Sequence, residues 1–178
     1  MILRELIKFY YITGTFACQG IVAVAFDGKN CYNTSQGGDR MKVLVSACLL
    51  GRNCKYNGGN NYCPKVAVFV QDKDVIPVCP EELAGLGTPR IPIEIVNGVL
   101  TRKDGVVVDQ QLRAAVAQIL KEISGEKIEA AVLKSRSPTC GVKQVYDGTF
   151  SGVLTEGAGS LAQALMDAGY NVIDSEDV

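Results

Sequence analysis

Three short apolar runs lie along the chain, and each of them leads into a loop that carries a cysteine. The runs are Val43–Val45, Val75–Val78 and Ala130–Leu133. Apolar runs of this length, bounded by turn residues, predict buried strands. A further strand is predicted at Asn171–Ile173, near the end of the chain. The hydrophobic pattern therefore predicts a core of short strands whose ends carry the chemically interesting side chains.

The segments between these strands have the spacing of helices. Apolar residues recur at helical intervals after Asp109, which is placed to cap a helix that runs to Ser124. Further helices are predicted from Pro64 and over residues 159–168, and prolines exclude regular structure in the loop that carries Arg90. Alternating strands and helices predict an α/β fold with a parallel sheet and helices on both faces.

Two regions have a less regular pattern. The segments Ile93–Leu100 and Val106–Val108 predict a small hairpin, because Asn-Gly and Asp-Gly pairs nearby are turn signals. The segment Val142–Thr155 is interrupted by glycines, so no clear element is expected there. Its aromatic residues Tyr146 and Phe150 are expected to cover the functional site.

Residues 1–40 differ in pattern from the rest of the chain. Their apolar residues have no clear period, and a polar, loop-like run extends over residues 27–40. They also make a poor secretory signal. The codons for Gly37–Asp39 can be read as a ribosome-binding site just before Met41. We therefore expect residues 1–40 to be a non-native leader or an extension, followed by a single domain over residues 41–178.

Composition narrows the functional classes. The chain has 178 residues, a formal net charge of −1 and no histidine. The absence of histidine excludes Ser-His-Asp and Cys-His catalysis and His-ligated zinc. The charge balance does not favour a nucleic-acid partner. No apolar run is long enough to span a bilayer, so no membrane partner is expected.

Seven cysteines are many for a chain without a secretory signal. Their odd number argues against a complete disulfide framework, and the sequence is typical of a cytoplasmic protein with reduced thiols. Cys18 and Cys31 fall in the expected leader and are left out of the site.

The remaining cysteines are the candidate metal ligands. Cys48, Cys79 and Cys140 each follow a predicted strand, and the carboxyl ends of parallel strands lie at one edge of a sheet. Three thiolates without histidine suit an iron–sulfur cluster or zinc. The alternative is that they are small buried hydrophobic residues. Cys54 is either a fourth ligand or a loop thiol, and Cys63 is expected to contribute to packing.

Polar residues next to these cysteines are the candidate catalytic groups. Glu81 follows Cys79 by two residues and is placed to act as a general base for water, or simply as an acid at a helix N-terminus. Glu82 has the same structural explanation and a weaker functional case. Ser137 is placed to bond a substrate heteroatom, or to form a turn before proline. The flanking Lys134 and Arg136 are either substrate contacts or solvated residues.

Four motifs together resemble a known family. They are SACLLG at Ser46–Gly51, C-x-Y-x-G-G at Cys54–Gly59, VCPE at Val78–Glu81 and SRSPTCG at Ser135–Gly141. In this order they are similar to the stand-alone form of the thiouracil desulfidase family, formerly a domain of unknown function. The resemblance covers the chain from Met41 to its end.

The resemblance implies a small Rossmann-like three-layer sandwich that holds a [4Fe–4S] cluster through Cys48, Cys79 and Cys140. It also implies an open fourth iron that binds the sulfur of a thiocarbonyl substrate. Glu81 would activate water, and Ser137 would orient the ring or relay a proton. Asn57 stands where the family is expected to have aspartate, so only a turn function is expected there.

These observations lead to one main hypothesis and two alternatives. The main hypothesis is a cluster-dependent desulfidase that converts thiouracil-type thiocarbonyls to carbonyls with release of sulfide. Its substrate is a thiolated pyrimidine base, nucleoside or nucleotide, and RNA is a further candidate that the charge does not favour. The alternatives are a non-catalytic cluster carrier and a zinc protein that uses Cys54 as a fourth ligand. A carrier would need neither Glu81 nor Ser137.

Overall fold

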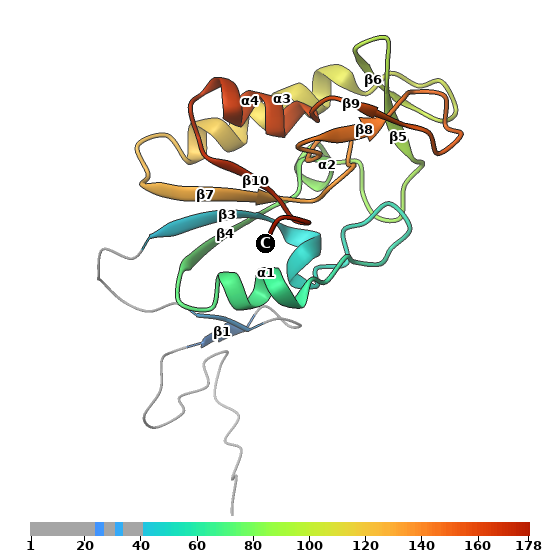
Figure 1. The fold of residues 1–178 in the computed structure, drawn as a ribbon. Coiled ribbons are helices and arrows are strands. Elements are labelled where there is room, and N and C mark those ends of the chain that lie inside the picture. The colour runs from blue at the N-terminus through green and yellow to red at the C-terminus, as the bar shows by residue number, and fades with distance from the viewer. Residues whose placement is uncertain (1–23, 27–30, 34–40) are drawn as a thin grey trace, which may run out of the picture. The chain divides into compact units, whose positions relative to one another are not determined.

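The computed structural model describes residues 24–26, 31–33 and 41–178 (Figure 1). Contacts along the chain divide it into two units, Met1–Asp39 and Arg40–Val178. The second unit contains every residue of the predicted site, and the fold is described below for this unit.

The first unit contains one described feature. Strands β1 (Val24–Phe26) and β2 (Cys31–Asn33) pair antiparallel. The predicted leader falls on this unit, and most of it, including Cys18, lies outside the described residues. The assignment of residues 1–40 as a leader therefore stays a prediction.

A four-stranded parallel sheet forms the centre of the second unit. Its spatial order is β10-β7-β3-β4, so that β3 and β7 are neighbours at the middle of the sheet. The four predicted strands are all present: β3 (Lys42–Ser46), β4 (Asp74–Val78), β7 (Ile128–Leu133) and β10 (Val172–Asp174). The chain moves from β3 outwards to β4 and then returns to the other side of β3. Sheets of this kind bind ligands where the strand order reverses, outside the carboxyl ends of the strands.

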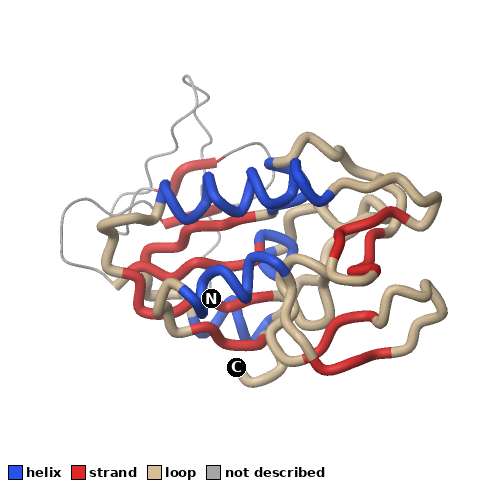
Figure 2. Tube along the Cα trace, turned by 90° about the horizontal axis from the view of Figure 1, so that it is seen from above, coloured by secondary structure: helices blue, strands red, loops and turns tan. Residues whose placement is uncertain are grey.

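Helices cover both faces of this sheet (Figures 1 and 2). Helix α1 (Pro64–Phe69) lies on one face, whereas α3 (Asp109–Glu122) and α4 (Ser160–Asp167) lie on the other. Side chains of β3 alternate accordingly: Val43 and Val45 belong to the core on the α1 side, and Leu44 belongs to the core on the α3 and α4 side. The predicted α/β class with three layers is confirmed. No helix in the described ranges is long and apolar enough to cross a membrane.

The hairpin predicted after residue 92 forms with a different register. Strands β5 (Ile93–Val96) and β6 (Val99–Arg102) pair antiparallel, and the prediction that Val106–Val108 supplies the second strand is wrong. Asn97 and Gly98 both have positive φ angles, 49° and 81°, which allow a two-residue turn inside the expected first strand. Val107 forms only an isolated bridge to β6.

The segment that was expected to lack regular structure contains a second hairpin. Its strands are β8 (Gln144–Tyr146) and β9 (Leu154–Glu156). Strands of three residues are too short to show a two-residue hydrophobic period, which explains why the sequence pattern missed them. Both hairpins lie beyond the carboxyl ends of the sheet strands, next to each other (Figures 1 and 2).

Candidate active site

A cavity of about 450 Å³ lies at the carboxyl ends of β3, β4 and β7. All five residues predicted for the site line it, namely Cys48, Cys79, Cys140, Glu81 and Ser137. Tyr146 of β8 and Phe150 of the following turn also line it, so the prediction that they cover the site is confirmed. The parallel sheet thus brings together Cys48 and Cys140, which are 92 residues apart in the sequence.

The local structure after each strand places one cysteine in the cavity wall. Cys48 lies in a short 3-10 helix, Ala47–Leu50, directly after β3. Cys79 is the N-cap of α2 (Pro80–Leu83), directly after β4. Cys140 lies in the loop after β7 and is buried, with 5% of its surface exposed. Each strand end therefore supplies one thiol from a different loop.

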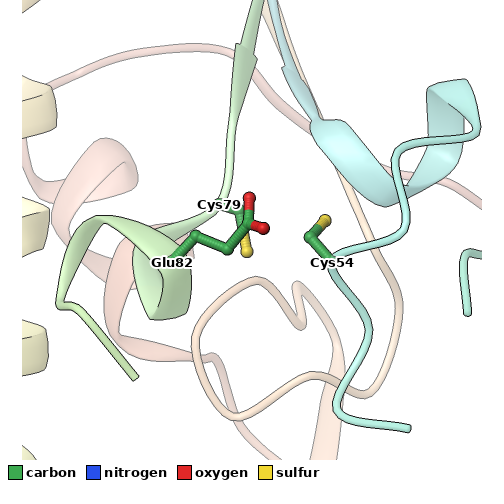
Figure 3. Close-up of side chains that lie close together, drawn as sticks. All are labelled: Cys54, Cys79 and Glu82. Atoms are coloured by element: carbon green, nitrogen blue, oxygen red, sulfur yellow. The ribbon is translucent and has the colours of Figure 1, made fainter. Parts of the chain in front are cut away.

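A fourth thiol lies beside two of these three. The donor atoms of Cys54, Cys79 and Glu82 lie within 4.8 Å of one another (Figure 3). Cys54 is buried and lines the cavity, whereas Glu82 does not line it and is ion-paired with Arg52 at 3.0 Å. Sequence reasoning left the role of Cys54 open, and its position next to Cys79 keeps it as a candidate ligand. Cys63 packs against the core on the α1 side and is not among the residues that line the cavity.

The thiols differ in their acidity in the metal-free chain. A hydrogen bond from Cys54 lowers the pKa of Cys48 to about 7, despite the opposing effect of burial. Hydrogen bonds to Cys48 and Cys79, in turn, raise the pKa of Cys54. Burial raises the pKa of Cys140, and the nearby charge of Glu81 adds to this. The lowered pKa of Cys48 favours its thiolate, which is the form of cysteine that binds a metal.

Glu81 is held by contacts to two loops. Its side chain is buried, with 7% of the residue exposed. Its Oε1 accepts a hydrogen bond from Thr139 Oγ1 at 2.8 Å, and its Oε2 accepts one from the Cys79 thiol at 3.4 Å. Arg90 lies 3.9 Å from the same Oε2. A carboxylate held in this way lies next to both the cysteines and the cavity.

Ser137 forms the turn considered for it in the sequence and also lies in the cavity wall. Its Oγ accepts hydrogen bonds from the backbone N–H groups of Thr139 and Cys140, at 3.2 and 3.1 Å, which is the turn geometry. It also lines the cavity, where it can face a substrate. Sequence reasoning missed Thr139, which is fully buried and links Ser137 to Glu81. The available signal was its place between Ser137 and Cys140 in the SRSPTCG motif.

Arg90 and Asn57 hold the loop that carries Cys54. The Arg90 guanidinium donates to the carbonyl oxygens of Cys54 and Gly87, at 3.0 and 3.1 Å, and so clamps the backbone of two loops together. Asn57 Oδ1 accepts a hydrogen bond from the N–H of Gly59 at 3.2 Å, which confirms a turn function at that position.

Basic residues outnumber acidic residues in the cavity wall. Two carboxylates, Glu81 and Glu94, line it together with five cationic side chains: Lys55, Arg90, Lys103, Lys134 and Arg136. Arg90 and Arg136 are ion-paired with Glu81 and Glu176, so the surplus of positive charge in the wall comes from its lysines, in a chain with a formal net charge of −1. A local field of this sign favours an anionic ligand.

The N-terminus of α4 supports the Cys140 loop. The backbone N–H groups of Ser160 and Leu161 donate to the carbonyl oxygens of Pro138 and Thr139, at 3.1 and 2.8 Å. The approach is close enough that a Cβ atom at Gly159 would lie 2.4 Å from the carbonyl carbon of Thr139. The third thiol is thus positioned by backbone contacts that only glycine permits at this point.

We expect Gly159→Ala to displace the Cys140 loop and to lower the free energy of unfolding by about 2 kcal/mol. Iron uptake on reconstitution is expected to fall with it, because one of the three thiols is moved. Thermal unfolding and iron analysis measure both effects. Gly59→Ala is the control, since its added methyl would meet only the flexible Asn57 side chain, at 3.3 Å. Equal stability and iron uptake in both variants would show that the Cys140 loop does not need glycine at position 159.

Comparison with known proteins identifies the family. The family model described as 2-thiouracil desulfurase matches residues 43–177, which include all four motifs and the whole cavity wall. The chain belongs to the 2-thiouracil desulfurase family. The resemblance predicted from the four motifs is therefore confirmed.

Two relatives place the family assignment in context. The uncharacterized protein YbbK of Bacillus subtilis (strain 168) is 35% identical over an alignment of 146 residues, and the match covers 76% of this chain and 97% of YbbK. The solved structure of the [4Fe–4S]-dependent thiouracil desulfidase TudS matches with a TM-score of 0.73 at 29% identity. That match covers 78% of this chain and 93% of TudS, so the similarity extends over nearly the whole of both relatives.

Proposed function

We propose that this protein is an iron–sulfur-dependent desulfidase that converts the thiocarbonyl group of a thiolated pyrimidine to a carbonyl and releases sulfide. The observation that carries the proposal is the convergence of three strand-end thiols and a buried carboxylate on one cavity, in a 2-thiouracil desulfurase family member. The structural relative TudS, which is a [4Fe–4S]-dependent enzyme, supports the same cofactor.

The donor set fits an iron–sulfur cluster. Cys48, Cys79 and Cys140 are the residues that would hold it, because they are free thiols that line one cavity and come from separate loops. Thiolates are the ligands that iron–sulfur clusters use. Held by these three residues, the cluster would supply a Lewis-acidic iron for the substrate sulfur. Cys54 is a further thiol beside this set.

The protein's own residues provide the remaining chemistry. Glu81 is placed to take a proton from the water that adds to the thiocarbonyl carbon, since its carboxylate lines the cavity beside Cys79. Ser137 lines the same cavity and would orient the ring. Tyr146 and Phe150 add aromatic surface to the wall, which suits a flat heterocyclic ring and helps to exclude bulk water.

The cationic wall supports an anionic form of the substrate. A free thiolated base carries no phosphate and would leave the side chains of Lys55 and Lys103 without a partner in the ligand. A cavity of about 450 Å³ also has room for more than a single pyrimidine ring. We therefore propose a thiolated nucleoside 5′-monophosphate as the preferred substrate, with the free base as a poorer one.

The double variant Lys55→Met/Lys103→Met tests this preference. Its KM for the thiouridine 5′-monophosphate is expected to rise about tenfold, because a charge-assisted contact to phosphate is lost. Its KM for free thiouracil should stay near that of the unmodified protein. Lys143→Met is the control, since Lys143 is ion-paired with Asp177 and does not belong to the cavity wall. Equal changes in KM for both substrates would contradict a phosphate contact.

Anaerobic reconstitution with iron and sulfide tests the proposed function as a whole. The same sample is examined by ultraviolet–visible spectroscopy and by a thiouracil-to-uracil turnover assay. A broad cluster absorption together with turnover is the expected result. Cluster binding without turnover on the base, nucleoside or nucleotide would favour the carrier alternative. Tight binding of zinc and no uptake of iron would favour a zinc protein.

We further propose that the protein works in the cytoplasm. The five cysteines of residues 41–178 are all free thiols, which a reducing compartment maintains. An iron centre with an open coordination position also needs such conditions, because oxidants attack exposed clusters. The reconstituted protein is therefore kept free of oxygen in each assay.

A further inference from the structure

One buried hydroxyl group lies between the two polar groups of the proposed active site. Thr139 is fully buried, with an exposed fraction of 0%. Its Oγ1 lies 2.8 Å from Glu81 Oε1, 3.1 Å from Ser137 Oγ and 3.6 Å from Cys140 Sγ. Glu81 and Ser137 line the cavity, whereas Thr139 is not among the lining residues. Thr139 therefore joins the two groups from behind the cavity wall.

The direction of the hydrogen bonds follows from the chemistry of the groups. The Thr139 hydroxyl has a single proton, and it donates this proton to Glu81 Oε1, which is much closer than the other acceptor, Cys140 Sγ. Thr139 can then only accept from Ser137, which means that the Ser137 hydroxyl is the donor in the second bond. The Ser137 oxygen in turn accepts from the N–H groups of Thr139 and Cys140. The chain from Ser137 through Thr139 to Glu81 thus has one direction.

This chain determines how both groups are oriented. Thr139 holds Oε1 of Glu81, so that Oε2 is the oxygen that lies beside the Cys79 thiol and Arg90. It also determines the direction of the Ser137 O–H bond. We infer that Thr139 is a positioning residue, which orients the Glu81 carboxylate and the Ser137 hydroxyl through a single hydroxyl group. The inference rests on the proposed function for its catalytic consequence, but not for the geometry.

Removal of the hydroxyl should disturb both partners at once. Valine has nearly the shape of threonine, so Thr139→Val keeps the packing and leaves Glu81 Oε1 and the Ser137 hydroxyl without their shared partner. A buried carboxylate oxygen without a donor turns toward another donor or toward water. The Glu81 carboxylate would then lose its alignment with the cavity, and the Ser137 hydroxyl would lose its fixed O–H direction.

The kinetic test compares Thr139→Val with Thr139→Ser, which restores the hydroxyl group. Per bound cluster, kcat of Thr139→Val is expected to fall about 100-fold, as for a misplaced catalytic group, while KM changes little. Thr139→Ser should recover most of the lost kcat. Iron content and the absorption spectrum should stay unchanged in both variants. An unchanged kcat in Thr139→Val, or an equally slow Thr139→Ser, would overturn the inference.

A double-mutant comparison tests whether Thr139 acts through its partners. If it acts through Ser137, the loss of kcat in Ser137→Ala/Thr139→Val will be smaller than the product of the two single losses. Multiplicative losses would overturn the inference, because they indicate independent effects.

A crystal structure of metal-free Thr139→Val supplies a readout that does not depend on activity. The Glu81 carboxylate is expected to rotate away from its position in the unmodified chain, and to keep that position in Thr139→Ser. An unmoved carboxylate in Thr139→Val would overturn the inference. A reconstituted wild-type protein without turnover would instead contradict the proposed function, and the crystal structures would still test the positioning.

Discussion

Replacement of Cys140 by alanine is expected to abolish cluster binding and to lower turnover more than about 100-fold. The loss should exceed that caused by replacing a residue that only supports a metal ligand. Of the three cysteines, Cys140 is the one whose replacement should lower cluster binding the most. Cys54 lies beside Cys48 and Cys79, so a variant of either keeps a neighbouring thiol that can bind iron in its place. Cys140 is delivered by a separate loop, after β7. Iron and sulfide analysis after anaerobic reconstitution, together with the turnover assay, measures the effect.

Cys63→Ala is the matched control for this prediction. Cys63 is also a free thiol, but it packs against the core on the α1 side and is not among the residues that line the cavity. The control variant is expected to bind a full cluster and to keep its activity. If Cys140→Ala bound as much iron as the unmodified protein, Cys140 would not be a ligand. It would then serve only as a small hydrophobic residue of the core.

Replacement of Glu81 by glutamine is expected to have the second largest effect. Turnover should fall by about 10²- to 10⁴-fold, the usual contribution of a general base, while the cluster spectrum stays unchanged. Glutamine has nearly the same size, and its amide oxygen can still accept the hydrogen bond from Thr139. What it lacks is the ability to take a proton from water. Single-turnover kinetics on the reconstituted variant separates this effect from a change in binding.

Glu82→Gln is the control for Glu81→Gln. Both carboxylates lie in the first turn of α2, but Glu82 is paired with Arg52 and does not belong to the cavity wall. Its replacement is expected to leave turnover close to that of the unmodified protein. Equal losses in the two variants would indicate that α2 needs negative charge at its N-terminus, which is the structural alternative considered for both residues.

The central sheet of the second unit was predictable from the sequence for a physical reason. Strands buried on both faces read as short, continuous apolar runs, and the runs at Val43, Val75 and Ala130 all became strands of the parallel sheet. The hairpins were less predictable. The register of β5 and β6 depends on which of two turn signals is used, and β8 and β9 are too short to show a period.

The sequence by itself determined which residues gather at the cavity. Cys48, Cys79 and Cys140 each follow an apolar run, and parallel strands place all such ends at one edge of the sheet. The four motifs determined the family, which the family model confirms. Both results depend on local patterns in the chain, namely which residue follows a strand and which residues stand together in a motif.

Only the tertiary structure decided how these residues touch one another. The bond between Thr139 and Glu81 joins positions 58 residues apart, and no local pattern encodes which hydroxyl will meet which carboxylate. The same holds for Cys54 beside Cys79, for the Arg90 clamp and for the cationic wall in a chain of nearly neutral charge. Such contacts depend on the packing of several loops against each other, to within fractions of an ångström, and therefore appear only when the whole domain is folded.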